Sequence, residues 1–140
     1  MQLIFMIAAI WGWFSWGSEG VQIPSRLTPA WRMIGAAGIV GLWALLAPVL
    51  QNIGGVATRG DAFMLVGSLA AQLLMVLQKM ETWPVWIAVN IVGTLLYASQ
   101  GLYFTSLFYA VLIAMAVTGW RAWSARVKAD GASSPAPAHA

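Results

Sequence analysis

The few charged residues of this chain are separated by long uncharged runs. Residues 1–18, 33–58, 62–78 and 82–120 contain no Asp, Glu, Lys or Arg. The chain is 61% hydrophobic and 8% charged, whereas a soluble domain carries roughly 25% charged residues. Because one bilayer crossing needs about 20 apolar residues, the pattern predicts an all-α integral membrane protein.

We expect about five transmembrane helices, at residues 1–16, 31–51, 61–80, 83–99 and 103–123. The last uncharged run is too long for one crossing, so it must fold back at Ser99-Gln100-Gly101. Residues 17–30 contain Gly and Pro among polar neighbours and are expected to form a loop. Residues 124–140 end in Ala, Ser and Pro and are expected to form a disordered tail.

The basic residues predict the orientation. If five helices alternate in direction, one side of the membrane receives Arg26, Arg32, Lys79, Arg121, Arg126 and Lys128. The other side receives only Arg59. Since Lys and Arg favour the cytoplasmic side, we expect a multi-pass protein of the cell (inner) membrane with a cytoplasmic C-terminus and an external Met1. The first segment lacks the basic start and the cleavage site of a signal peptide.

Several function classes have no support in the sequence. The net charge of +3 is not gathered on a basic face, so no nucleic-acid partner is expected. There is no cysteine, and a single His139 in the tail cannot build a metal site. No nucleophile is paired with a base, so we expect neither an enzyme nor a bound cofactor.

One polar stripe runs along the helix expected at 83–99. At 100° per residue, five side chains fall within an arc of about 80°; they are Trp83, Trp86, Asn90, Thr94 and Tyr97. Polar groups inside a membrane face a bundle interior or a cavity, which favours a substrate site. The alternatives are an interfacial aromatic belt for the two indoles and helix–helix hydrogen bonding for Asn90.

Other helices carry matching polar positions. Gln72 lies near the middle of the helix expected at 61–80, where an amide needs a partner or a ligand. Tyr109 and Trp120 share one face of the last helix, and Gln2 and Trp13 lie about 20° apart on the first. Together these residues predict a substrate cavity lined by indoles, phenols and carboxamides. Such a lining suits a flat, polar, uncharged or cationic ring and suits a phosphate poorly.

A repeated motif ends the first and the last apolar segments. Gly12-Trp13-x-x-Trp16 returns as Gly119-Trp120-x-x-Trp123, 107 residues later. A repeat of this kind indicates a duplicated helical unit, which is a common plan of small-solute transporters.

These motifs resemble those of the PnuC-type nicotinamide riboside transporters. The resemblance covers about residues 1–123 and rests on Trp83-x-x-Trp86-x-x-x-Asn90, Leu96-Tyr97, Gly101-Leu102-Tyr103-Phe104-Thr105, Tyr109 and Gly119-Trp120-x-x-Trp123, with Asp61-Ala62 and Gln72 in the same pattern. It implies the architecture of the sugar-transporting SWEET proteins, in which a linker helix joins two three-helix bundles. It also implies uptake of nicotinamide riboside, an NAD precursor, by facilitated diffusion, with trapping by a cytoplasmic riboside kinase.

The resemblance assigns a place to each segment. Residues 1–16 correspond to the last helix of the first bundle, 31–51 to the linker and 61–123 to the complete second bundle. The first two helices of the first bundle are then missing, so we expect an N-terminally truncated member of the family.

Alternative functions stay open from the sequence. Family members that take thiamine or riboflavin have similarly flat ligands, and a small membrane subunit without a substrate would fit a truncated chain. A third alternative, an integral-membrane enzyme, lacks a positioned acid–base pair. Gly35, Gly38 and Gly41 form a line of small residues that permits close helix packing, either within the chain or in a homo-oligomer.

Overall fold

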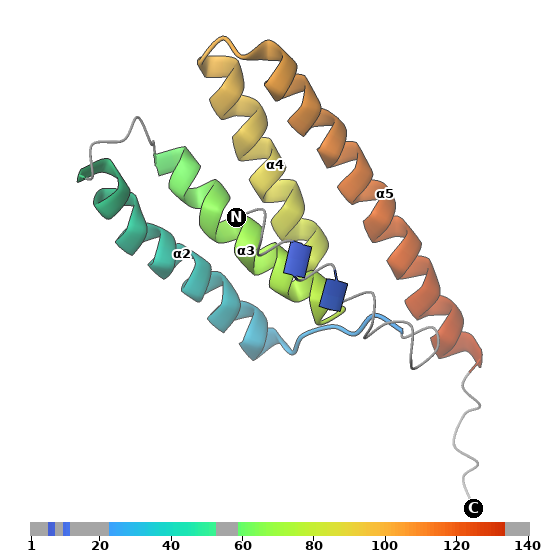
Figure 1. The fold of residues 1–140 in the computed structure, drawn as a ribbon. Helices are drawn as coiled ribbons and strands as arrows, with labels where there is room; N and C mark the ends of the chain where they lie inside the picture. Colours follow the sequence, from blue (N-terminus) through green and yellow to red (C-terminus); the bar gives the residue numbers. More distant parts are fainter. Residues whose placement is uncertain (1–5, 8–9, 12–22, 53–58, 134–140) are drawn as a thin grey trace, which may run out of the picture.

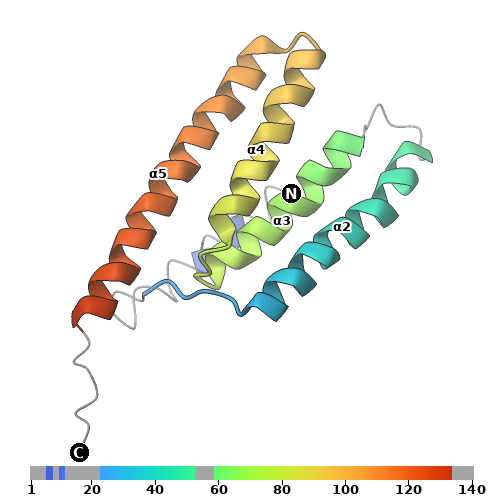
Figure 2. The same cartoon turned by 180° about the vertical axis from the view of Figure 1, so that it is seen from behind.

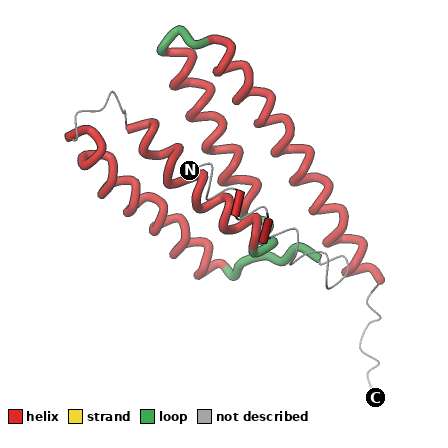
Figure 3. Tube along the Cα trace, in the orientation of Figure 1, coloured by secondary structure: helices red, strands yellow, loops and turns green. Residues whose placement is uncertain are grey.

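The fold is a row of four long helices. A computed structural model describes residues 6–7, 10–11, 23–52 and 59–133. In these residues the helices are α2 (Pro29–Asn52), α3 (Arg59–Val76), α4 (Thr82–Ser99) and α5 (Tyr103–Ser133). They follow one another in space as they do in the chain, from α2 at one edge to α5 at the other (Figures 1 and 2). The described part contains helices and connecting loops but no β-strand (Figure 3).

All four helices are long and apolar enough to cross a membrane. They confirm the spans that the uncharged runs predict from residue 31 onward. The first expected helix, at residues 1–16, lies outside the described residues except for two short helical pieces at 6–7 and 10–11. Within the described part, α3 and α5 both pack against α4 and not against each other. α4 is therefore the centre of a three-helix unit, and α2 packs on the outside of α3.

The turn between α3 and α4 begins earlier than expected. The helix predicted to reach residue 80 ends at Val76, because Gln78 adopts a left-handed conformation with φ of 51°. The Lys79 N–H donates to the Leu74 carbonyl at 2.8 Å, and the Gln78 N–H donates to the Met75 carbonyl at 3.0 Å. These are the two bonds of a Schellman cap. Glycine usually occupies the left-handed position of that cap, so no local residue predicted the cap here.

The turn between α4 and α5 has the same cap with the usual residue. Gly101 has φ of 74°, the Gly101 N–H donates to the Ala98 carbonyl at 3.1 Å, and the Leu102 N–H donates to the Tyr97 carbonyl at 2.9 Å. α4 ends at Ser99, so the fold-back expected at residues 99–101 is confirmed.

α5 is longer than the sequence suggested. The expectation of a disordered tail from residue 124 is wrong as far as Ser133, because α5 continues to that residue. The segment after Trp123 contains Ala, Arg and Lys, which are strong helix formers. Pro135 follows two residues after the helix end, and the residue before a proline avoids the helical conformation. Length and apolarity predict the membrane span, but they do not mark where the helix stops.

Close contacts join α4 to its two neighbours. The Thr82 hydroxyl donates to the Ala71 carbonyl of α3 at 2.9 Å, and the Ser106 hydroxyl of α5 donates to the Thr94 carbonyl at 2.8 Å. Gly67 of α3 lets that helix approach Val89, because a Cβ there would lie 2.5 Å from the valine Cγ2. These contacts hold the three helices around the cavity described next.

Candidate functional site

A cavity of about 370 Å³ lies among α3, α4 and α5. Its described lining is Asp61, Met64, Leu65 and Ser68 of α3, Trp86, Val89, Asn90 and Tyr97 of α4, and Tyr109 and Leu112 of α5. Because α3 and α5 each pack on α4 without packing on each other, α4 forms the floor of the cavity and the other two helices form its walls. A volume of this size suits a small organic ligand.

Asn90 is the most distinctive polar group of the cavity. The residue is only 3% exposed, and its Oδ1 atom has no hydrogen-bond partner among the described residues. An unsatisfied buried acceptor costs about 1–3 kcal/mol. A helix–helix hydrogen bond through this oxygen would require a partner, and the described part of the chain offers none. A ligand N–H or O–H in the cavity would satisfy it.

Two tyrosines line one end of the cavity. The rings of Tyr97 and Tyr109 stack with centroids 5.3 Å apart and planes 20° apart. Gly93 makes this packing possible, because a Cβ at that position would lie 2.7 Å from Cδ1 of Tyr109 and 3.0 Å from Cε of Met64. Gly93 was missed from the sequence, because a lone glycine in a helix carries no signal of the ring that covers it.

Asp61 lies at the same end of the cavity as the tyrosine pair. It is in the first turn of α3, where a carboxylate is favoured by the helix dipole. No other charged side chain belongs to the described lining of the cavity. The place of Asp61 in the lining could not be deduced, because helical periodicity gives an angle around the axis and not the neighbour at that angle.

The residues predicted for a site fall into three groups. The structure brings Trp86, Asn90, Tyr97 and Tyr109 together in the cavity lining. The described lining does not include Gln72, Trp83, Thr94 or Trp120. Gln2 and Trp13 lie outside the described residues. The substrate-binding role of every one of these residues stays a prediction.

Trp83 and Thr94 have other contacts. The Trp83 indole meets Trp123 edge-on at a centroid distance of 5.2 Å, and it covers Gly119, where a Cβ would overlap its six-membered ring. The Thr94 hydroxyl donates to the Asn90 carbonyl of its own helix at 2.8 Å. Thus the second Gly-Trp-x-x-Trp motif supplies two residues, Gly119 and Trp123, that hold Trp83 against α5.

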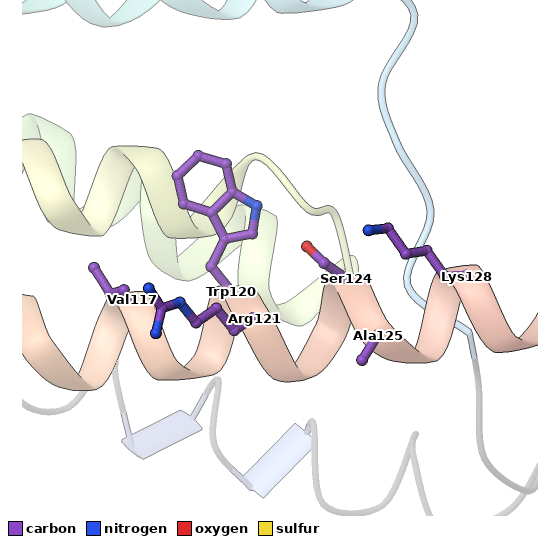
Figure 4. Close-up of a pocket in the computed structure, with 6 residues that line it drawn as sticks. All are labelled: Val117, Trp120, Arg121, Ser124, Ala125 and Lys128. Carbon is purple, nitrogen blue, oxygen red and sulfur yellow. The ribbon is translucent and has the colours of Figure 1, made fainter.

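Trp120, the remaining residue of that motif, lines a separate groove on α5. The groove has a volume of about 430 Å³, and its described lining is Val117, Trp120, Arg121, Ser124, Ala125 and Lys128. Figure 4 shows the indole of Trp120, the hydroxyl of Ser124 and the ammonium group of Lys128 rising from one side of α5. This groove begins where the uncharged part of α5 ends.

The chemistry of the cavity limits which kind of ligand would suit it. Its aromatic rings can stack on a planar heterocycle, and Asn90 can accept a hydrogen bond. No group of three or more His, Cys, Asp or Glu residues that could hold a metal occurs in the described part. The arrangement therefore suits recognition of a flat, polar molecule.

Comparison with known proteins points in the same direction. Residues 1–125 match the family model described as nicotinamide mononucleotide transporter. The nicotinamide riboside transporter PnuC of Escherichia coli (strain K12) is 27% identical over 166 residues, which cover 96% of this chain and 70% of that protein. The riboflavin/roseoflavin transporter RibM of Streptomyces davaonensis is 29% identical over 139 residues, covering 92% of this chain and 64% of that one.

A solved structure supports the fold. The crystal structure of the vitamin B3 transporter PnuC superimposes with a TM-score of 0.73 at 24% identity, covering 91% of this chain and 60% of that one. The chain thus spans between 60% and 70% of the length of these relatives. The expected all-helical fold of PnuC type is confirmed. The match over residues 1–125 shows that this chain belongs to the nicotinamide mononucleotide transporter family of membrane proteins, which includes the PnuC transporters.

Proposed function

We propose that the cavity among α3, α4 and α5 binds nicotinamide riboside, and that the protein takes up this NAD precursor by facilitated diffusion across the inner membrane. The observation that carries the proposal is the unpartnered Oδ1 atom of the buried Asn90, in a cavity that Trp86 also lines. The carboxamide N–H groups or the ribose hydroxyls of the ligand can donate to this oxygen. The indole supplies a surface for stacking on the ring.

The cavity favours the riboside over its phosphorylated form. No Lys or Arg belongs to the described lining of the cavity, and recognition of a phosphate generally requires such groups. Facilitated diffusion moves a solute only down its gradient. A cytoplasmic kinase that phosphorylates the riboside would keep the gradient directed inward, and we include this functional link in the proposal.

The distribution of basic groups supports a cytoplasmic C-terminus. Arg26 and Arg32 line one pocket together with Glu81 and Trp120, so the start of α2, the α3–α4 turn and the basic end of α5 share one end of the bundle. Arg59, at the start of α3, lies at the opposite end of that helix. Under the positive-inside rule the shared end faces the cytoplasm.

A related riboflavin transporter is the second candidate. The similarity to RibM covers 92% of this chain. The isoalloxazine ring of riboflavin is also flat and can stack on aromatic side chains. Riboflavin is larger than nicotinamide riboside and its ring is neutral. A competition experiment between the two ligands therefore shows which of them the protein prefers.

Uptake by cells tests the proposed function. Cells without another riboside transporter, expressing the full chain, should accumulate labelled nicotinamide riboside, and the Asn90→Ala variant should lose most of this uptake. The Thr118→Ala variant is the matched control, because the Thr118 hydroxyl is exposed and donates within its own helix to Met115. Uptake of riboflavin but not of the riboside would support the second candidate.

Binding to purified protein tests the remaining alternative, a membrane subunit without a substrate. A ligand present at 100 times its Kd stabilises the folded state by about 2.7 kcal/mol. Thermal unfolding in detergent that is unchanged by nicotinamide riboside and riboflavin, at concentrations into the millimolar range, would contradict a transport role for this chain.

A further inference from the structure

The end of the cavity that holds Asp61 combines one carboxylate with two aromatic rings. α3 and α4 run in opposite directions, so α3 begins toward the end of the bundle where α4 ends and α5 begins (Figure 1). Asp61, Tyr97 and Tyr109 come from these three places and line the same cavity. We call these three residues the cavity mouth.

Asn90 lines the cavity about two turns of α4 away from the mouth. It precedes Tyr97 by seven residues on α4, which corresponds to about 10 Å along the helix axis. A nucleoside is of similar length. A ligand whose sugar or carboxamide reaches Asn90 therefore extends toward the mouth, so a charge on its ring lies within the field of the mouth carboxylate.

The charge at the mouth is opposite to that of a pyridinium ring. Asp61 is the only charged residue of the described lining, and the faces of the stacked Tyr97 and Tyr109 rings also attract cations. At an effective dielectric constant of about 20, the field of this carboxylate still acts on a unit charge elsewhere in the cavity. A hydrogen bond alone cannot distinguish a cationic ring from a neutral ring of the same shape, but this field can.

We propose that Asp61, supported by the Tyr97–Tyr109 pair, determines specificity for a positively charged ring at the cavity mouth. The inference rests on the proposed function and deepens it. It assigns the ligand to the class of cationic heterocyclic ribosides, and it assigns the discrimination against neutral rings to one carboxylate. Asn90 recognises polar groups of the ligand, whereas Asp61 recognises its charge.

A matched pair of ligands tests this assignment. Nicotinamide riboside has a pyridinium ring, and its reduced dihydro form has a neutral ring of nearly the same size. Binding of both is measured by calorimetry on the purified full chain. Wild-type protein should bind the oxidised form more tightly, and Asp61→Asn should weaken that binding by about tenfold while changing the affinity for the reduced form by less than about twofold.

Two control variants complete the experiment. Asp61→Glu keeps the carboxylate and should keep most of the preference for the cationic ligand. Asp130→Asn removes the same charge near the far end of α5 and should leave the ratio of the two affinities unchanged. Retained binding of the reduced riboside by Asp61→Asn shows at the same time that this variant is folded.

Failure of the inference and failure of the proposed function are distinguishable. Equal loss of both ligands in Asp61→Asn, or no change in either, overturns charge selection by Asp61 and leaves nicotinamide riboside as the substrate. Absence of binding of both forms by the wild-type chain overturns the proposed function and the inference together.

Discussion

Gly119 of α5 lies directly against the indole of Trp83 of α4, and a Cβ at position 119 would overlap the six-membered ring. The same indole meets Trp123 edge-on, one turn further along α5. The glycine of the repeated motif therefore permits close approach of two helices. Its role is in packing, and it positions an aromatic ring near the end of the bundle that contains the α3–α4 turn.

Gly119→Ala should destabilise the protein. Overpacking a close helix contact costs about 1–3 kcal/mol, which would lower the apparent Tm measured by thermal unfolding in detergent. Gly38→Ala is the control, because a Cβ at position 38 meets nothing within 4 Å and alanine favours the helix by about 0.5–1 kcal/mol. Similar Tm values for the two variants would contradict the packing role of Gly119.

Asn90→Leu separates a binding role from a structural one. The buried Oδ1 atom has no partner among the described residues, so replacing the amide with an apolar side chain of similar volume should leave the thermal stability unchanged or raise it. Binding of nicotinamide riboside should weaken by about 10- to 100-fold, as expected when about 1–3 kcal/mol of hydrogen-bond free energy is lost. Reduced stability with unchanged binding would indicate a helix–helix contact and not a site.

The helical wheel predicted that five residues share one face of α4, but it could not assign a function to each position on that face. Trp83, Trp86 and Asn90 fall within an arc of about 60° around the axis, and only the latter two belong to the described lining of the cavity. Trp83 lies about one turn closer to the helix end, where α5 presents Gly119 and Trp123 in place of open space. The position of a tryptophan along the helix and the residues that face it decide whether the indole is packed or lines the cavity. The facing residues depend on tertiary structure.

The two turns show how far local sequence can predict backbone structure. Gly101 marked its turn because glycine adopts a positive φ without steric cost. Gln78 adopts the corresponding conformation without being glycine, and no sequence signal accompanied it. Its neighbours explain the conformation, because the Gln78 carbonyl accepts the Ser25 N–H at 3.1 Å and the Met80 N–H donates to the Ser25 carbonyl at 2.9 Å. A contact more than 50 residues away in sequence thus fixes this turn.

Gln78→Gly and Gly101→Ala should have opposite effects on stability. A left-handed conformation costs a residue with a Cβ about 1–2 kcal/mol, so glycine at 78 should raise the Tm and alanine at 101 should lower it. A Cβ at position 101 meets nothing within 4 Å, so the expected loss there is conformational and not steric. Thermal unfolding of the two variants under one condition provides the comparison. A lower Tm for Gln78→Gly would show that the glutamine side chain contributes more than its backbone strain costs.

Glu81 joins the segment before α2 to the α3–α4 turn. Its two carboxylate oxygens each accept the Leu27 N–H at 3.2 Å, and Oε1 also accepts Arg32 Nε at 2.8 Å. Lys79 adds a hydrogen bond from Nζ to the Ser25 hydroxyl at 2.7 Å. The segment is thereby fixed to the turn at the end of the bundle where α2 begins.

The two bonds of Glu81 should contribute unequally. The Arg32 side chain is 45% exposed and that of Glu81 is 15% exposed. Solvent therefore screens the ion pair, which should contribute only about 0.2–1 kcal/mol. The bond to the Leu27 N–H is made to a charged acceptor and should contribute about 1.5–3 kcal/mol. We therefore expect Glu81→Ala to lower the free energy of unfolding more than Arg32→Ala does.

A double-mutant cycle measures this difference. The coupling energy between Arg32→Ala and Glu81→Ala should be smaller than the loss caused by Glu81→Ala alone, because most of that loss comes from the Leu27 N–H, which Arg32 does not touch. Raising the salt concentration should reduce the coupling further. Arg126→Ala, a basic residue on α5, controls for the removal of a positive charge. A coupling energy equal to the whole loss from Glu81→Ala would mean that the ion pair, and not the backbone contact, holds the segment in place.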